Sequence, residues 1–293
     1  MMGGMTDPDV NEEYLLTLDC PDRPGIVHAV SGFLAERSCN ILDSQQYGDP
    51  ETGRYFMRVH LAPLDPATTG DRLGTEFADV ATAFAMTWTL VPVANRTRLL
   101  IMCSREGHCL NDLLFRWRSG TLPVVVVGVV SNHMDLAGLV EPYGVPYHYL
   151  PVSSGARPEA EARLLQLVDE LHVELVVLAR YMQVLSPQLC RTLDGRVINI
   201  HHSFLPGFTG ARPYHQAHDR GVKIIGATAH YVTPVLDDGP IIEQDVVRVR
   251  HDQGATALAA AGRDVECQVL ARAVRWHCER RVITNGARTV VFS

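Results

Sequence analysis

Three features are absent from this sequence, and each absence excludes a class of protein. The longest apolar run, residues 122–130, has the length of a strand and falls short of the ~20 residues that a membrane-spanning helix needs. Lys and Arg form no block and the net charge is -7, which argues against a nucleic-acid-binding surface. The seven cysteines are scattered, odd in number and without a Cys-x-x-Cys motif. We therefore expect no membrane or nucleic-acid partner, no disulfide framework and no structural zinc site.

The first residues, MMGGMTDPD, lack the charged and apolar regions of a signal peptide. We predict a disordered lead over residues 1–10 and a cytoplasmic protein. The remaining composition, 46% hydrophobic and 20% charged residues, is ordinary for a globular chain.

The spacing of apolar residues divides the 293-residue chain into two domains. Strand-like segments at 14–19, 40–46, 55–61 and 86–91 alternate with helical spacing at 26–35 and 73–85. The order βαββαβ predicts a ferredoxin-like domain over residues 11–93. A polar stretch at 94–98 is the predicted linker to a second domain, residues 99–293.

In the second domain, Val/Ile-rich strands alternate with helices. This pattern predicts an α/β domain with a doubly wound, mostly parallel sheet, whose ligand sites lie at the carboxyl ends of strands. We expect strands at 99–103, 124–130, 147–150, 175–179, 197–200, 224–231 and 241–249, a long helix at 255–279 and a final edge strand at 289–292.

Three polar side chains are placed so that one site can use them together. Asn199 and His201 lie two residues apart at the end of an apolar run, and residues i and i+2 of a strand share a face. Asp237 lies in the turn LDDGP, which can bring a carboxylate beside a histidine. Each also has a purely structural explanation, a turn-forming amide for Asn199 and a capping carboxylate for Asp237. We expect no metal, because His201 and His202 are adjacent and should face opposite sides, and no third ligand follows at helical spacing.

Two segments, INIHHSFLPG at 198–207 and LDDGP at 236–240, resemble the signature of the enzyme family that uses 10-formyltetrahydrofolate. Within that family the resemblance is to the formyltetrahydrofolate deformylases, and it runs from about residue 14 to residue 292. The segment DRPGIV at 22–27 is similar to the opening of ACT domains, which often bind amino acids and pair through their sheets. The resemblance implies an N-terminal ferredoxin-like ACT domain followed by a formyltransferase-like catalytic domain.

The resemblance implies hydrolysis of 10-formyltetrahydrofolate to tetrahydrofolate and formate, with no cofactor and no metal. Asn199 and His201 would stabilise the negative formyl oxygen of the tetrahedral intermediate, and Asp237 would assist water and proton transfer. The resemblance also implies a set of substrate-binding residues, namely Arg180, Tyr181, Met182, Gln183, Leu185, His108 and Gly239. From the residues alone, Met182 can equally fill the core, and His108 can be a helix-start residue without a chemical role.

Alternatives stay open for the acceptor of the formyl group. Formyltransferases that act on a phosphorylated amine, of the glycinamide ribonucleotide type, hold the phosphate in a Gly/Ser-rich loop before a helix. Here that loop reads CSREGHCL at 103–110 with a single glycine, and His202 stands where those enzymes usually have proline. Together with the ACT-like domain, these features favour water. A third hypothesis, a non-enzymatic amino-acid sensor, is disfavoured by the complete set of Asn199, His201 and Asp237.

The resemblance makes Asp22, Arg23, Pro24 and Gly25 the expected site of an amino-acid effector, glycine or methionine. The alternative is that Pro24 and Gly25 simply end a strand and start a helix. Sheet pairing of the ACT type predicts a homodimer or a homotetramer.

Four further positions lie near or outside the expected site. Arg212, in a loop at 207–214, is expected either to meet the glutamate tail of folate or to be exposed. Arg105, Gly207 and Ala287 depart from the residues that are common in the family, and none of them is one of the three expected catalytic residues. The pathway that the reaction serves, purine supply or folate balance, is not specified by these residues.

Overall fold

The computed structural model describes residues 12–153, 155–205 and 213–293. The predicted disordered lead, 1–10, and the predicted loop residues Gly207 and Arg212 lie outside these described residues. The chain forms two compact units: one contains Met1–Asn95, Glu279–Ile283 and Val290–Ser293, and the other contains Arg96–Cys278 and Thr284–Thr289. This division differs from the expected boundaries, 11–93 and 99–293 with a linker at 94–98, mainly because two C-terminal segments belong with the first unit.

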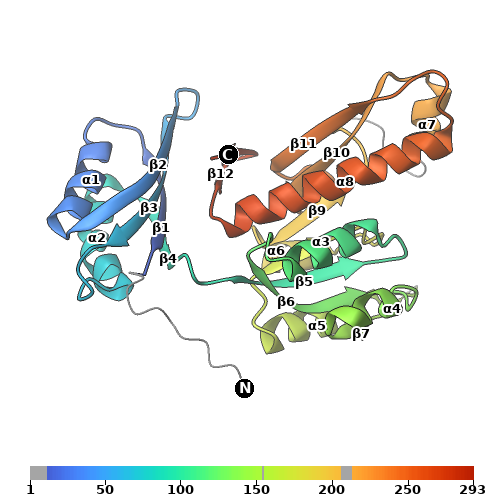
Figure 1. Ribbon diagram of the computed structural model, residues 1–293, viewed down its shortest axis with the longest axis horizontal. Helices are drawn as coiled ribbons and strands as arrows, with labels where there is room; N and C mark the ends of the chain where they lie inside the picture. Colours follow the sequence, from blue (N-terminus) through green and yellow to red (C-terminus); the bar gives the residue numbers. More distant parts are fainter. Residues whose placement is uncertain (1–11, 154, 206–212) are drawn as a thin grey trace. The chain divides into compact units, whose positions relative to one another are not determined.

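The first unit is an antiparallel sheet with two helices on one face (Figure 1). Phe33 of one helix meets Phe77 of the other edge to face, with 5.1 Å between ring centroids. Both rings belong to a core that also contains Leu16 and Leu18, alternate residues of a strand that therefore point to the same face. The elements are β1 (Tyr14–Pro21), α1 (Ile26–Glu36), β2 (Cys39–Asp49), β3 (Arg54–Pro63), α2 (Gly70–Phe84) and β4 (Thr87–Pro92), with sheet order β2-β3-β1-β4. The predicted ferredoxin-like order βαββαβ is confirmed.

The second unit contains a seven-stranded, mostly parallel sheet, as the alternating pattern predicts. Its strands are β5 (Thr97–Cys103), β6 (Val124–Ser131), β7 (Tyr147–Tyr149), β8 (Leu175–Leu178), β9 (Val197–His201), β10 (Ile224–Tyr231) and β11 (Ile241–Arg248). They are ordered β11-β10-β9-β8-β5-β6-β7. The strands from β9 to β7 pair in parallel, whereas β10 runs antiparallel to both β9 and β11. The carboxyl ends of β8 and β9 are therefore neighbours at one edge of the sheet.

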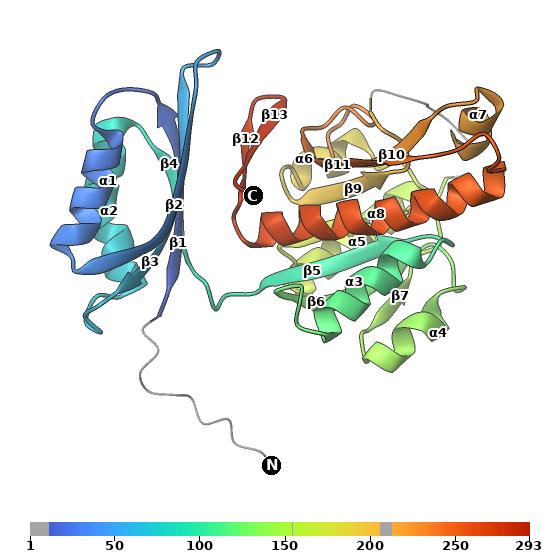
Figure 2. The same cartoon turned by 45° about the horizontal axis from the view of Figure 1, so that its top comes forward.

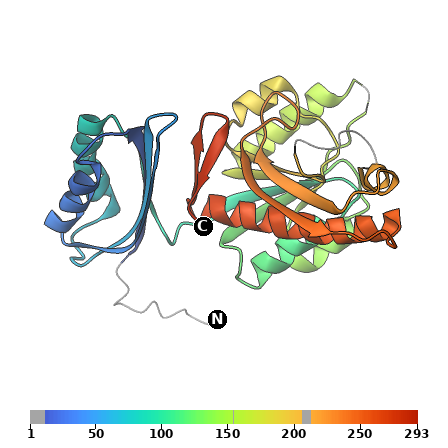
Figure 3. The same cartoon turned by 90° about the horizontal axis from the view of Figure 1, so that it is seen from above.

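Helices cover both faces of this sheet (Figure 3). They are α3 (His108–Arg118), α4 (Ala137–Val140), the 3-10 helix η1 (Glu141–Tyr143), α5 (Arg157–Glu170), α6 (Pro187–Thr192), α7 (Pro213–Asp219) and α8 (Ala255–Cys278). The long helix α8 packs along β9, β10 and β11 and against α3 (Figure 2). Leucines of α5 and α6 share a core with Leu100 and Met102 of β5. Because β5 is covered on both sides, its residues from Leu99 to Cys103 are all buried. No helix in the described ranges is both long enough and apolar enough to cross a bilayer.

The C-terminal residues form a hairpin of their own. β12 (Val282–Asn285) and β13 (Arg288–Val291) make a separate two-stranded sheet, joined by a turn in which Gly286 has a φ of 62°. The final strand expected at 289–292 is present as β13, and its partner is β12 and not a strand of the large sheet. The two strands are short and joined by a tight turn, so they find their hydrogen-bond partners locally.

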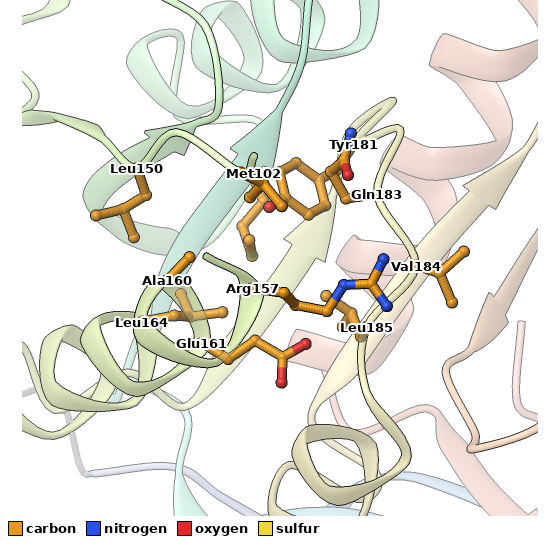
Figure 4. A pocket seen from close by; sticks show the side chains of 11 residues that line it. Met102, Leu150, Arg157, Ala160, Glu161, Leu164, Tyr181, Gln183, Val184 and Leu185 are labelled. Carbon is orange, nitrogen blue, oxygen red and sulfur yellow. The ribbon is translucent and has the colours of Figure 1, made fainter. Parts of the chain in front are cut away.

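Ser186 ties the end of the segment after β8 to α5. Its hydroxyl accepts the Leu189 N–H as the N-cap of α6, and it donates to the carboxylate of Glu161 on α5. The backbone N–H of Ser186 donates to the same carboxylate at 2.8 Å. Glu161 also lines a small cavity of about 20 Å³, large enough for one water molecule. Tyr181, Gln183, Val184 and Leu185 line the same cavity (Figure 4). The hydrogen bonds between Ser186 and Glu161 thus fix the end of segment 181–185 to α5, and only a small cavity separates the two.

We expect Ser186→Ala to lower the free energy of unfolding by about 1 kcal/mol, because α6 loses its cap and Glu161 loses a donor. Urea unfolding followed by circular dichroism measures the difference. Thr192→Ala is the matched control: its hydroxyl donates to the Gln188 carbonyl at the exposed end of the same helix, so its loss should stay within about 0.5 kcal/mol. Equal losses in both variants would contradict the assigned role of Ser186.

Candidate active site

A histidine–carboxylate pair stands at the carboxyl end of β9. His201 is the last residue of the strand and is 8% exposed, and its Nδ1 lies 3.2 Å from Oδ2 of Asp237. Nδ1–H donates to the carboxylate, which fixes the orientation of the ring. His201 Nε2 is buried and has no hydrogen-bond partner among the described residues. The imidazole therefore keeps one nitrogen available for a bound molecule.

The turn that carries Asp237 lies directly against β10. Asp237 has a φ of 55°, in the left-handed region, and the Tyr231 N–H donates to the Pro240 carbonyl at 2.9 Å. Gly239 is buried so close to this strand that a Cβ there would overlap the carbonyl oxygen of Tyr231. Only glycine allows this approach, and the approach brings the carboxylate to His201.

The pKa of Asp237 lies well below its ordinary value of 3.8, because the hydrogen bond from His201 and then the nearby His230 ring lower it by more than burial raises it. The group is therefore ionised throughout the physiological pH range. An anionic partner of this kind favours a proton on His201 when a nearby atom develops negative charge.

Asn199 lies on the same face of β9 and is paired across the sheet with His230 of β10. His230 Nδ1 lies 2.9 Å from the Tyr231 carbonyl, to which it donates, and Nε2 accepts from the Asn199 amide at 3.2 Å when the ring is neutral. The same Nε2 lies 3.7 Å from Oδ1 of Asp237. His230 thus borders two of the three expected catalytic residues. Its place in the strand segment TAHYV predicts a packed or hydrogen-bonded histidine and not a proton carrier, and the hydrogen bonds of this buried ring are confirmed. Its contact with Asn199 was not predicted, because the register between β9 and β10 is not readable from spacing.

One cavity of about 350 Å³ joins these groups, a volume in the range of small-molecule sites. The expected catalytic residues and most of the expected substrate-binding residues line it together: Asn199, His201, Asp237, Arg180, Tyr181, Met182, Gln183 and Leu185. Its wall also includes His202, His230, Cys190 and Leu236. Met182 is 57% exposed, so it is not core filler. His108 and Gly239 do not line the cavity: the first lies in a neighbouring cluster, and the second supports the Asp237 turn.

The segment that lines the cavity after β8 is fastened to the loop after β5. Ser104 is 3% exposed, and its hydroxyl donates to Asn132 Oδ1 at 2.7 Å and accepts the Met182 N–H at 2.9 Å. The Ser104 N–H donates to the carbonyl of Arg180, whose own φ is 63°. These hydrogen bonds join the segments that follow β5, β6 and β8, and no local sequence pattern predicts them.

A second buried carboxylate lies beside the cavity wall. Glu266 of α8 is 1% exposed and accepts from His108 Nε2 at 2.7 Å and from the Tyr214 hydroxyl at 2.5 Å, with Arg180 Nε at 3.4 Å. We call these four residues the Glu266 cluster. Burial alone would raise the pKa of Glu266, but the bond from His108, the charge of Arg180 and the bond from Tyr214 lower it below its ordinary value.

Atoms of His108, Cys109 and Glu266 that can bind metals lie within 4.8 Å of one another, the only such group of three among the described residues. However, Nε2 of His108 is already hydrogen-bonded to Glu266, and that carboxylate has two further donors. Both carboxylate oxygens of Glu266 and Nε2 of His108 are thus already engaged with protein groups, so we assign this group no metal.

His202 does not face away from His201 as the strand alternation suggests. The strand ends at His201, and the two rings stack with centroids 5.1 Å apart and 19° between their planes. Burial first, and then the charges of Arg180 and His201, lower the pKa of His202 from 6.5 to about 4. His202 is therefore neutral at physiological pH, and it stands between the cavity and the Glu266 cluster.

In the first unit, the expected effector loop between β1 and α1 is exposed. Gly25 has a φ of 98° and precedes the first turn of α1, which is a backbone reason for glycine. The Arg23 guanidinium lies 4.3 Å from the centre of the Phe84 ring and donates to the Ala83 carbonyl. Asp22 donates its N–H to the Gly53 carbonyl at 2.8 Å. An effector at Asp22, Arg23, Pro24 and Gly25 stays a prediction.

Comparison with known proteins gives matches to both units. The family model for formyl transferases matches residues 97–274, and the model for ACT domains matches residues 14–74. The formyltetrahydrofolate deformylase of Corynebacterium sp. (strain P-1) is 55% identical, covering 95% of this chain and 98% of the relative. That of Bacillus subtilis is 48% identical, covering 97% and 96%.

Solved structures extend this similarity to three dimensions. The crystal structure of formyltetrahydrofolate deformylase from Burkholderia mallei superposes with a TM-score of 0.92 at 49% identity, covering 96% of this chain and all of that one. Glycinamide ribonucleotide transformylase 1 from Symbiobacterium toebii has a TM-score of 0.65 at 30% identity and covers 70% of this chain and 98% of its own. The first similarity extends over both units, whereas the second covers only part of the chain.

We expect the stability of the wild-type protein to fall between pH 6.5 and pH 4 relative to that of His202→Gln. The folded protein keeps His202 neutral down to a pKa of about 4, whereas the unfolded chain takes up a proton below about 6.5. The favourable contribution is thus complete above 6.5 and lost as the pH falls to 4, by at most ~3.5 kcal/mol at about 1.4 kcal/mol per pH unit. Urea unfolding at several pH values measures it.

The matched control for this experiment is His28→Gln, at an exposed position of α1. It tests the general effect of replacing a histidine by glutamine. A stability difference between wild type and His202→Gln that does not change with pH would contradict the assignment of a buried neutral imidazole.

Proposed function

The chain belongs to the formyl transferase family, among the formyltetrahydrofolate deformylases, and from this premise we propose that it hydrolyses 10-formyltetrahydrofolate to tetrahydrofolate and formate. The observation that carries the proposal is His201: its Nδ1 is held by Asp237, and its buried Nε2 has no partner among the described residues. Asn199 borders the same cavity and supplies an amide donor. These are the groups that a tetrahedral oxyanion intermediate needs.

In the proposed binding mode, the flat pterin ring lies along residues 180–185, where Met182 and Leu185 give apolar contact and the backbone gives hydrogen bonds. Ser104 holds the Met182 N–H, and Ser186 fastens the end of the segment, so the wall is rigid before substrate arrives. Preorganisation of this kind lowers the cost of ordering the site on binding. The formyl group then lies at the inner end, beside Asn199 and His201.

In the proposed reaction, the formyl oxygen accepts hydrogen bonds from the Asn199 amide and from Nε2–H of protonated His201. Asp237 Oδ2 holds the imidazole, and Oδ1 of this 24% exposed side chain accepts from the attacking water. The water oxygen bonds to the formyl carbon and gives up one proton, which passes by way of Asp237 to His201. The bond from carbon to N10 breaks as His201 gives its proton to N10, and the formic acid that leaves loses its remaining acidic proton to solvent as formate. Protein groups supply every donor and acceptor, so the proposed reaction uses no cofactor and no metal.

Formyl transfer to a phosphorylated amine is the alternative function, and the loop after β5 argues against it. A phosphate held there would need free donors, but the Ser104 hydroxyl is bonded to Asn132 and Met182. The buried carboxylate of Glu266 lies against His108, the first residue of α3, where it would repel an anion. The hydrolase is therefore the function that the geometry supports better. The amino-acid effector and the homodimer or homotetramer remain proposals for the ACT-like unit.

We expect Asp237→Ala to lower the rate of formate release by about 10³-fold or more, because His201 loses the group that orients and charges it. Binding of tetrahydrofolate, followed by calorimetry, should persist. Asp238→Ala is the matched control, since this exposed carboxylate is the next residue of the same turn, and its rate should stay near that of the wild type. Near-normal turnover of Asp237→Ala would remove the role assigned to it.

We expect Gly239→Ala to lower kcat by about 10²-fold with a smaller change in KM, because the Asp237 turn must move away from β10. Steady-state formate release measures both constants. Gly254→Ala is the control, because an added Cβ there meets no atom within 4 Å and φ is not positive. An unchanged kcat in Gly239→Ala would show that the close approach of the turn is not needed.

A further inference from the structure

Beside His201, a single layer of side chains, Arg180 and His202, separates the cavity from the residues behind them. Arg180 and His202 line the cavity, whereas Glu266, Tyr214 and His108 directly behind them do not. Arg180 Nε lies 3.4 Å from the Glu266 carboxylate, and the rings of His202 and Tyr214 have centroids 6.5 Å apart. Glu266, Tyr214 and His108 therefore lie behind Arg180 and His202, next to the reaction centre.

The ring of Tyr214 fits into a space that α8 leaves open for it. A Cβ at Gly262 would overlap the Tyr214 ring, so the absence of a side chain at this position admits the phenol. Gly262 stands one helical turn before Glu266, and the Tyr214 hydroxyl reaches that carboxylate at 2.5 Å. Glycine and glutamate on one face of α8 thus hold the phenol between them, beside His202.

Tyr214 and His108 together cover a charge that would otherwise attract an amine. Glu266 is ionised, 1% exposed and next to the reaction centre. Its oxygens are occupied by the Tyr214 hydroxyl and by His108 Nε2. A carboxylate without these two partners would be a favourable neighbour for an ammonium group or an amine N–H.

We propose that the Glu266 cluster determines which acceptor takes the formyl group: Tyr214 and His108 cover the carboxylate and close the side of the site beside His202, so water reaches the formyl carbon and an amine does not. This inference rests on the proposed function. With folate along residues 180–185, as in the proposed binding mode, an amine acceptor would approach the formyl carbon beside His202. Tyr214 is the specificity-determining residue because its ring packs beside His202 and over Gly262, and its hydroxyl covers one oxygen of Glu266.

The two outcomes differ in one bond. With water, an oxygen bonds to the formyl carbon as its bond to N10 breaks, which gives formate and tetrahydrofolate. With a primary amine, a nitrogen bonds to that carbon, the same bond breaks, and the proton lost by the amine goes to N10, which gives an N-formyl amine and tetrahydrofolate. Neither route needs an oxidant or reductant. The molar ratio of formate to tetrahydrofolate is therefore one for hydrolysis and falls below one when an amine takes the group.

The experiment measures this ratio with purified full-length protein, 10-formyltetrahydrofolate and an excess of glycinamide, a small primary amine. Mass spectrometry measures N-formylglycinamide, and a reaction without protein corrects for direct transfer. Tyr214→Ala opens the closed side, while Tyr214→Phe keeps the ring and removes only the hydroxyl. His108→Ala removes the donor to the second oxygen of Glu266, and it tests the same inference if Tyr214→Ala does not fold. The ratio does not depend on how much activity a variant retains, so a merely structural loss does not change it.

We expect a ratio of one in the wild type with or without glycinamide. In Tyr214→Ala and His108→Ala, the N-formylglycinamide fraction should rise by about tenfold or more over the wild type, with a much smaller rise in Tyr214→Phe. A ratio of one in folded, hydrolysing Tyr214→Ala and His108→Ala would overturn the inference and leave the proposed function intact. Absence of hydrolysis in the wild type would instead overturn the proposed function, and the inference with it.

Discussion

The contact between Asp237 and His201 is the interaction on which the rest of the site depends. An imidazole at a strand end has two nitrogens and no intrinsic reason to direct a particular one at a substrate. The carboxylate removes this ambiguity by binding Nδ1. It can do so because the turn at 236–240 lies against β10, and that approach is possible only with glycine at position 239. A chemical requirement of the site is thus met by a backbone requirement at a residue two positions along the chain from Asp237.

The region around His201 contains two buried or half-buried carboxylates with lowered pKa values and opposite roles. Asp237 opens to the cavity, and its charge is partly compensated by His201 and His230. Glu266 is enclosed, and its charge is compensated by His108, Arg180 and Tyr214. Burying a charge without partners would cost several kcal/mol, so each carboxylate is retained only with its set of donors. His202 lies near both carboxylates and is neutral at physiological pH, because burial and then the charge of Arg180 lower its pKa.

The fold and the central site were accessible from the sequence because their signals are local. Strand and helix periodicities gave the βαββαβ unit and the mostly parallel sheet, and the i, i+2 spacing placed Asn199 and His201 in one cavity. The contributions of His230, of the pair Ser104 and Asn132, and of Glu266 depend on strand register and on contacts between distant elements. Glu266 lies within a 24-residue helix, where a single acidic residue is unremarkable in a helical pattern. The hairpin at the C-terminus was missed because it pairs locally and not with the large sheet.

The last residues of the chain also affect when the first unit can be completed. Arg58 on β3 is 4% exposed, and its guanidinium donates to the Glu279 carbonyl, 221 residues later in the chain. During synthesis the ACT-like unit leaves the ribosome first, yet this buried guanidinium must wait for the end of translation to gain its backbone acceptor. Until then, Asp43 is an acceptor that the N-terminal segment itself provides. The first unit therefore needs both ends of the chain, and this contact can form only after residue 279 has been synthesised.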